Sequence, residues 1–207
     1  MKKIIGLIII LLISYYFYSN MVVARAEMQE SIAEKLIRFH ILANSNSDED
    51  QNLKLQIKDK VLEYLDPFME DVQSAEEAKE VLATKEEEVL EIVKQGIAEA
   101  GYDYDAKVFY IEESFPLKSY GTINLPAGKY SAFKIIIGNG KGSNWWCVMF
   151  PPLCFVDLSL GSISIATTED RMSKYLTEDE FAFVLGKDSE INKGFVFKFK
   201  ILEWLKI

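Results

Sequence analysis

The sequence predicts an α+β protein with a single globular domain, in which an antiparallel sheet packs against N-terminal helices and a signal or anchor segment precedes the domain. Three observations support this prediction: an apolar N-terminus, helical periodicity between residues 48 and 100, and β-branched and aromatic runs after residue 102. The chain has 207 residues, which is enough for one domain and too few for two comfortable ones. Its hydrophobic fraction of 49% and charged fraction of 27% are typical of a folded protein and not of a disordered one.

The N-terminal segment has the features of a targeting signal. Lys2 and Lys3 form a basic start, an almost unbroken apolar stretch follows, and Ala24-Arg25-Ala26 places small residues where a signal peptidase would need them. Residues 4–24 are also long enough to cross a bilayer of roughly 30 Å as a helix. Residues 1–26 are therefore either a cleaved signal peptide or an uncleaved anchor with a membrane tether at residues 4–24.

In both cases the remainder of the chain, residues 27–207, is predicted to be an ectodomain outside the cytoplasm. The basic start keeps the N-terminus cytoplasmic, and the sequence has no second apolar run of that length. The formal net charge is −9, and losing Lys2, Lys3 and Arg25 with the leader would lower it to −12. An acidic chain without a dense lysine or arginine cluster repels phosphate backbones, so nucleic-acid binding is not expected.

The first predicted elements are a strand and a helix joined by a polar turn. Residues 37–42 have the period-2 pattern of a strand, and residues 44–47 are an Asn/Ser turn. Ser47 with Asp50 three residues later resembles a capping box, and the acidic residues 48–50 suit a helix N-terminus. Leu53 and its helical repeats give this helix an apolar face, and Pro67 is expected to end it.

A second helical region is expected across residues 74–100, as two helices or one broken helix. Ser74 with Glu77, and Thr84 with Glu87, give two possible capping boxes. Gly101 is a good C-terminal stop for the region.

Strands follow at residues 107–111, 129–137 and 144–150. The last two flank the glycine-rich residues 138–143, so residues 129–150 are predicted to form a β-hairpin. Farther on, residues 177–185 favour a short helix capped by Thr177, with Glu180 at its third position. Alternation at residues 195–199 favours a last strand.

The two cysteines, Cys147 and Cys154, flank the Pro151-Pro152 pair. In an exported protein such a close pair first suggests a disulfide. Two buried free thiols, or a cysteine nucleophile activated by His40, are the alternatives. No metal site is predicted, because one histidine and two cysteines lack zinc-site spacing and no HExxH is present. No cofactor motif is found either, since residues 138–143 do not match a P-loop.

His40 is the only histidine of the chain and lies in the predicted strand at residues 37–42. A histidine in that setting is more often structural than a catalytic base, and no nucleophile–base–orienter trio can be assembled from sequence distance. Trp145 and Trp146 are adjacent in a predicted strand, so their side chains point to opposite faces. One of them therefore faces solvent, a covering helix or a partner.

Several blocks together resemble the stage II sporulation protein R family, from about residue 37 to the C-terminus. They are RFHILANS at residues 38–45, DQNLK at residues 50–54, Phe115-Pro116, Tyr120-Gly121, PAGKY at residues 126–130 and NWWCVMFPPLC at residues 144–154. The last block is the most specific. Departures are small, such as Asn46 where the family more often has aspartate, and Ile57-Lys58-Asp59 in place of a Val-Arg-Asp-like run.

The resemblance implies an exported intercellular signalling protein of endospore formation. Such a protein would cross the forespore membrane into the space between the two membranes. There it would activate the membrane-embedded aspartic peptidase of the mother cell that processes the sigma-E precursor, as an activator and not an enzyme. The residues expected to contact the peptidase are the polar and aromatic ones of the motifs: His40, Asn44, Ser45, Asp50, Gln51, Trp145 and Trp146.

Two rival hypotheses remain open from the sequence. One is an exported hydrolase acting on cell-wall or protein substrates, with Cys147 or Cys154 as nucleophile and His40 as base. The other is a wall- or membrane-associated scaffold, which should not depend on any single polar motif residue.

Overall fold

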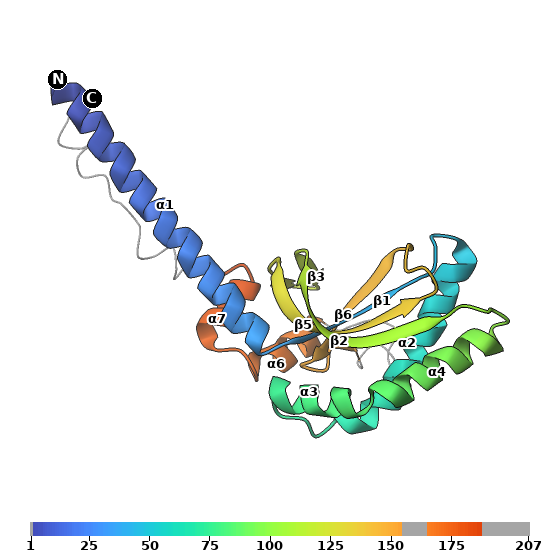
Figure 1. Ribbon diagram of the computed structural model, residues 1–207. Coiled ribbons are helices and arrows are strands. Elements are labelled where there is room, and N and C mark those ends of the chain that lie inside the picture. The colour runs from blue at the N-terminus through green and yellow to red at the C-terminus, as the bar shows by residue number, and fades with distance from the viewer. Residues whose placement is uncertain (1, 155–164, 188–207) are drawn as a thin grey trace.

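The computed structural model describes residues 2–154 and 165–187 as one α+β domain on a long N-terminal helix (Figure 1). The helices are α1 (Lys2–Glu34), α2 (Asp48–Met69), α3 (Ala75–Thr84), α4 (Glu86–Glu99), α6 (Ile165–Ser173) and α7 (Glu178–Val184). The strands are β1 (Ile37–Leu42), β2 (Ala106–Phe115), β3 (Lys118–Tyr120), β4 (Ile123–Leu125), β5 (Gly128–Ile137) and β6 (Asn144–Phe150).

Four strands form the main sheet in the order β2-β5-β1-β6, and β3 pairs with β4 in a separate hairpin. The β2–β5 and β1–β6 pairs are antiparallel, whereas β1 and β5 are parallel. The predicted fold class is therefore confirmed, with a mainly antiparallel sheet packed against helices that precede most of its strands in the chain.

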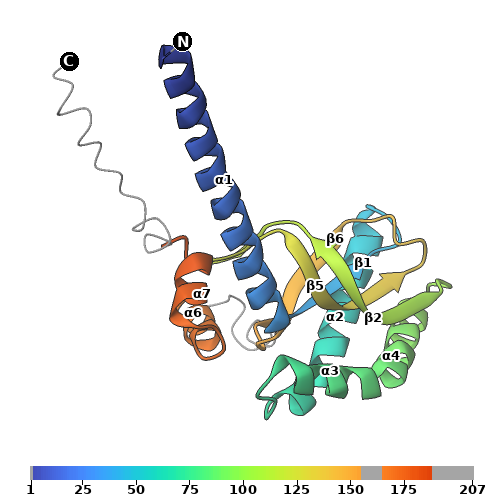
Figure 2. The same cartoon turned by 60° about the vertical axis from the view of Figure 1, so that its left-hand side comes forward.

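Helices α2, α3 and α4 cover one face of this sheet, which we call the inner face (Figures 1 and 2). Alternate residues of the strands point into this layer, such as Phe39 and Ile41 from β1 and Phe133 and Ile135 from β5, and all four are fully buried. At about 25 cal/mol per Å² of apolar surface, this core is the main favourable contribution to folding.

Within residues 2–154 and 165–187, the opposite face, the outer face, is covered at one end only. The last turns of α1 lie there with α6, α7 and the β3–β4 hairpin (Figure 2). Ile32, Leu36, Tyr130, Met172 and Val184 are buried in this second core. The other end of the outer face carries partly exposed side chains of β2, β5, β1 and β6.

The predicted hairpin of residues 129–150 is wrong, because β1 lies between β5 and β6. Residues 37–41 are buried on both faces of the sheet, and a strand of that kind needs a central position. The glycine-rich connection instead passes over the end of β1. It is held there by bonds from Gly142 N to Ala43 O (2.9 Å) and from Lys141 N to Asn44 O (3.2 Å).

Two predicted helix boundaries are also wrong. Pro67 lies inside α2, which continues to Met69; the Met69 side chain is 1% exposed, so packing holds the last turn. Thr84 does not cap α4, since its hydroxyl donates to Val81 O at the end of α3. The helix also begins after Lys85, with no side-chain cap.

Other local predictions are confirmed. Ser47 and Ser74 accept hydrogen bonds from the backbone N–H three residues later, and Thr177 forms the complete capping box with Glu180. Residues 74–100 form two helices, and Gly101 follows the second at φ 81°. The strand predicted at residues 195–199 lies outside the described residues.

Candidate functional site

The open end of the outer face brings together one residue from each strand of the main sheet. Phe109 of β2, Lys134 of β5, His40 of β1 and Trp146 of β6 are register partners in one row across the sheet. Glu113, four residues after Phe109 in β2, reaches this row through its contacts with Lys134 and His40. We call His40, Glu113, Lys134 and Trp146 the outer-face cluster.

Charge and aromatic contacts organise the cluster around His40. The Lys134 Nζ donates to both oxygens of Glu113, at 2.8 and 2.9 Å, and Glu113 Oε2 lies 3.0 Å from His40 Nε2. The imidazole stacks on the Trp146 ring with centroids 4.8 Å apart and 5° between the planes. His40 is only 1% exposed, so a partner could reach it only through the half-buried Glu113 and Trp146.

The environment keeps His40 neutral at pH 7. Burial lowers its pKa to about 4, the positive charge of Lys134 acts in the same direction, and the Glu113 carboxylate opposes both. Burial would raise the pKa of Glu113, but bonding to Lys134 and the proximity of His40 lower it. At neutral pH the cluster therefore presents to solvent the ion pair between Lys134 and Glu113, beside the ring of Trp146.

Arg38, two residues before His40, also points to the outer face but is completely buried. Its guanidinium carbon lies 4.6 Å from the ring centroid of Phe115 and 5.0 Å from that of Tyr130, and Nη2 donates to the Tyr120 hydroxyl at 3.0 Å. Cation–π contacts therefore replace the carboxylate that usually accompanies a buried arginine. Nε and Nη1 have no hydrogen-bond partner among the described residues.

Exposed apolar side chains border the cluster on β2. Phe109 is 38% and Ile111 41% exposed, and both lie on the outer face of this edge strand. Residues of this type beside a half-buried charged pair are what a protein-binding surface uses as anchors.

The predicted contact residues do not all meet at this site. Four of them lie instead at the corner between β1 and α2: Asn44, Ser45, Asp50 and Gln51. Of these four, Asn44 forms the hydrogen bonds to the loop of residues 138–143. Asn44 Nδ2 donates to Asp50 Oδ2 (2.9 Å), Asn44 Oδ1 accepts from Asn139 N (3.0 Å), and Gln51 Nε2 donates to Ser45 O (2.8 Å). Hydrogen bonds from Ser45 and Asn44 lower the pKa of Asp50 despite burial. A contact role for these four residues stays a prediction.

The two tryptophans point to opposite faces, as the strand alternation predicted. Trp145 packs edge-on against Phe39 in the inner-face layer, with centroids 5.6 Å apart, whereas Trp146 belongs to the outer-face cluster. Of the predicted contact residues, only His40 and Trp146 therefore belong to the outer-face cluster, and of these two only Trp146 is partly exposed.

Cys147 and Cys154 form a disulfide with Cα atoms 5.8 Å apart. Cys147 pairs in register with Phe39, on the inner face, while the adjacent His40 points outward. The bridge and the sheet together separate both sulfur atoms from the imidazole. The pairing of a cysteine nucleophile with His40 that the hydrolase hypothesis requires is therefore not formed. Among residues 2–154 and 165–187, no three His, Cys, Asp or Glu side chains gather as they would for a metal ion.

Sequence reasoning missed Arg38, Glu113 and Lys134 as members of the outer face. The alternation of residues 37–42 does place Arg38 with His40, so that signal was available. Nothing local pairs Glu113 or Lys134 with His40, because their proximity depends on β1 lying beside β5.

The fold thus defines an α+β domain attached to an apolar N-terminal helix, the arrangement of an exported or membrane-associated protein. The family model described as stage II sporulation protein R matches residues 33–160. The stage II sporulation protein R of Bacillus subtilis (strain 168) is 39% identical over 182 residues, which cover 84% of this chain and 81% of the relative. The chain therefore belongs to the stage II sporulation protein R family, whose members are not known as enzymes. No solved structure matches it.

Proposed function

We propose that this protein is an exported intercellular signal of endospore formation that activates the membrane-embedded aspartic peptidase processing the sigma-E precursor. Family membership is the observation that carries this proposal. The apolar N-terminal helix supports export from the forespore into the space between the two membranes. A bridged cysteine pair on the face opposite to His40 favours a ligand over a hydrolase.

The open end of the outer face is the surface we propose for contact with the peptidase. It combines the exposed Phe109 and Ile111 with the Lys134–Glu113 pair and Trp146. A ligand activates by binding the active state more tightly than the inactive one, and a tenfold preference corresponds to about 1.4 kcal/mol. Burial of two exposed apolar side chains is sufficient for a preference of that size.

A matched pair of substitutions tests the surface in sporulating cells that lack their own copy of the gene. Ile111→Glu places a charge in the proposed contact, and Leu55→Glu places the same charge on α2, remote from it; each side chain is 41% exposed. We expect Ile111→Glu to abolish processing of the sigma-E precursor, and Leu55→Glu to leave it unchanged. Immunoblots of the two variants must show equal accumulation.

Normal processing with Ile111→Glu would refute the outer face as the contact surface. Normal processing in cells that lack the protein altogether would refute the activating function itself.

A further inference from the structure

The N-terminal leader is one uninterrupted helix that ends inside the folded domain. Helix α1 runs from Lys2 to Glu34, so Ala24-Arg25-Ala26 lies within it and not in a loop. The apolar side chains before this motif are solvent-exposed, as Ile4 at 63% and Leu12 at 62% show. The helix is long and apolar enough to cross a membrane, and no other described helix is.

The last turns of α1 are part of the second core. Ile32 is fully buried there, and Leu36, just after the helix, is 1% exposed. One turn before Ile32, the Gln29 side chain donates to Lys129 O in β5 at 3.1 Å. The helix end is therefore fixed by the same apolar burial that stabilises the rest of this face.

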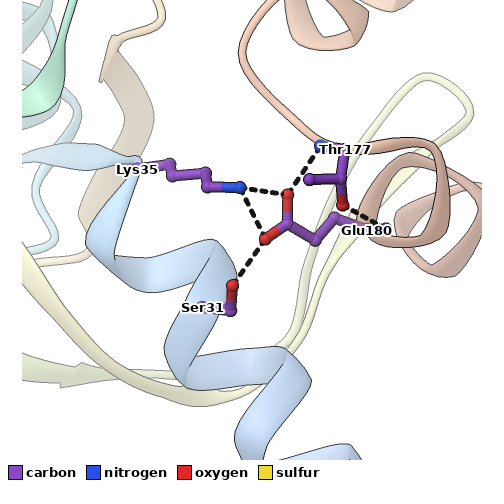
Figure 3. Close-up of polar contacts among 4 residues, drawn as sticks. All are labelled: Ser31, Lys35, Thr177 and Glu180. Atoms are coloured by element: carbon purple, nitrogen blue, oxygen red, sulfur yellow. Dashed lines mark hydrogen bonds and ion pairs between the residues drawn. The ribbon is translucent and has the colours of Figure 1, made fainter.

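A buried carboxylate joins the end of α1 to α7 (Figure 3). Glu180 is 3% exposed and accepts hydrogen bonds from Ser31 Oγ (2.6 Å) and from Lys35 Nζ (2.6 and 2.7 Å). Its Oε2 also accepts from Thr177 N at 2.7 Å, which completes the cap of α7. Charge-assisted bonds are about twice as strong as neutral ones, so this junction resists rotation or unwinding of the helix end.

These contacts bear on the cleavage motif because a peptidase acts on a locally unfolded segment. Processing after Ala26 would require unwinding of the helix around that residue, next to turns that the domain holds in place. With a rise of 1.5 Å per residue, Val23 at the end of the apolar run lies only about 13 Å from Ile32.

We propose that α1 is not removed but remains as a membrane-spanning anchor, protected from signal peptidase because the folded domain keeps its cleavage motif helical. The occupant of the exposed apolar part of α1 is then the lipid bilayer. A cavity of about 490 Å³ lies beside the cleavage motif, between Arg25, Gln29, Leu117 and Phe183. Leu117, which is 62% exposed in the β2–β3 connection, would face the bilayer surface.

The full chain with a C-terminal epitope, expressed in an exporting bacterium, tests this proposal against two variants. Met28→Gly with Gln29→Gly weakens the helix between the motif and the domain by about 1 kcal/mol per glycine relative to alanine. Met28→Ala with Gln29→Ala removes the same side chains but keeps the helix. We expect the wild type and the alanine variant to stay in alkali-washed membranes at full length, without loss of the leader from the 23.7 kDa chain.

The glycine variant should instead be released as a product beginning at Glu27, lighter by about 3 kDa as for the loss of a 26-residue leader. The masses and N-terminal peptides are measured by mass spectrometry. A wild-type protein that begins at Glu27 would overturn the proposal. A glycine variant that stays as intact as the alanine variant would overturn it too, because helical protection would then not be the reason for retention.

Discussion

Replacing His40 with phenylalanine should remove a large part of the pH dependence of stability between pH 7 and pH 5. The pKa of His40 falls from 6.5 to about 4 on folding, so the unfolded chain binds a proton in this range that the native protein does not. Stability is therefore fully present above pH 6.5 and is lost as the pH falls toward 4. The whole shift corresponds to about 3 kcal/mol at 1.36 kcal/mol per unit, and about 2 kcal/mol is lost by pH 5.

Phenylalanine can keep the stack on Trp146 and does not titrate, so the His40→Phe variant should lack this contribution. Urea unfolding of the full chain in mild detergent, followed by circular dichroism at pH 7 and pH 5, measures the difference. Glu113→Gln is the control: it removes the charge that raises the pKa of His40 and leaves the burial that lowers it, so the pH dependence should persist. A His40→Phe variant with the full wild-type slope would refute this explanation.

Three further predictions concern stability measured in the same way. Glu180→Gln should cost about 2 kcal/mol at pH 7, because charged hydrogen bonds are lost. Its pKa falls from 4.5 to about 2, so the wild-type advantage exists above pH 4.5 and should shrink as the pH falls toward 2. Gly142→Ala should cost about 2 kcal/mol or more, since its Cβ would meet the Ser45 carbonyl oxygen. The free energy of unfolding of Arg38→Met should stay within about 1 kcal/mol of that of the wild type. The substitution removes the contacts of the guanidinium, but it also removes the cost of burying its charge.

Two of these predictions, for Glu180→Gln and Arg38→Met, have a clear contrary outcome. Asp170→Asn removes an exposed ion pair with Lys174 and should cost almost nothing, so an equal loss in Glu180→Gln would mean that burial adds nothing at the junction. A loss with Glu180→Gln that is the same at pH 7 and pH 3 would contradict the linkage to its pKa. Loss of more than about 3 kcal/mol in Arg38→Met would show that the aromatic contacts outweigh the desolvation of the guanidinium.

The sequence predicted features that depend on nearby residues. The cap at Ser47, the capping box at Thr177 and the opposite directions of Trp145 and Trp146 all follow from spacings of three residues or fewer. The strand order could not be obtained in this way. A short glycine-rich connection ordinarily joins neighbouring strands, and only the complete burial of β1 shows that another strand must lie between them.

The candidate site was predicted incompletely for the same reason. His40 was identified because it is the only histidine, and Trp146 because it belongs to a distinctive motif. Glu113 and Lys134 are ordinary charged residues in strands, and they become notable only when β5 lies beside β1. Pro67 shows the converse case, in which burial of Met69 keeps a helical turn that local sequence preference disfavours.

The two faces of the sheet differ in the polar groups that they bury. The inner face, with its three helices, is apolar throughout its buried strand positions, whereas β1 directs Arg38 and His40 to the outer face. Charged or titratable groups in such positions lower stability unless they are compensated, and here the compensation is partial. Positions that reduce stability in this way are more often kept for binding than for folding. Because the same face also receives the end of α1, the proposed anchor would fix how the proposed contact surface is presented above the membrane.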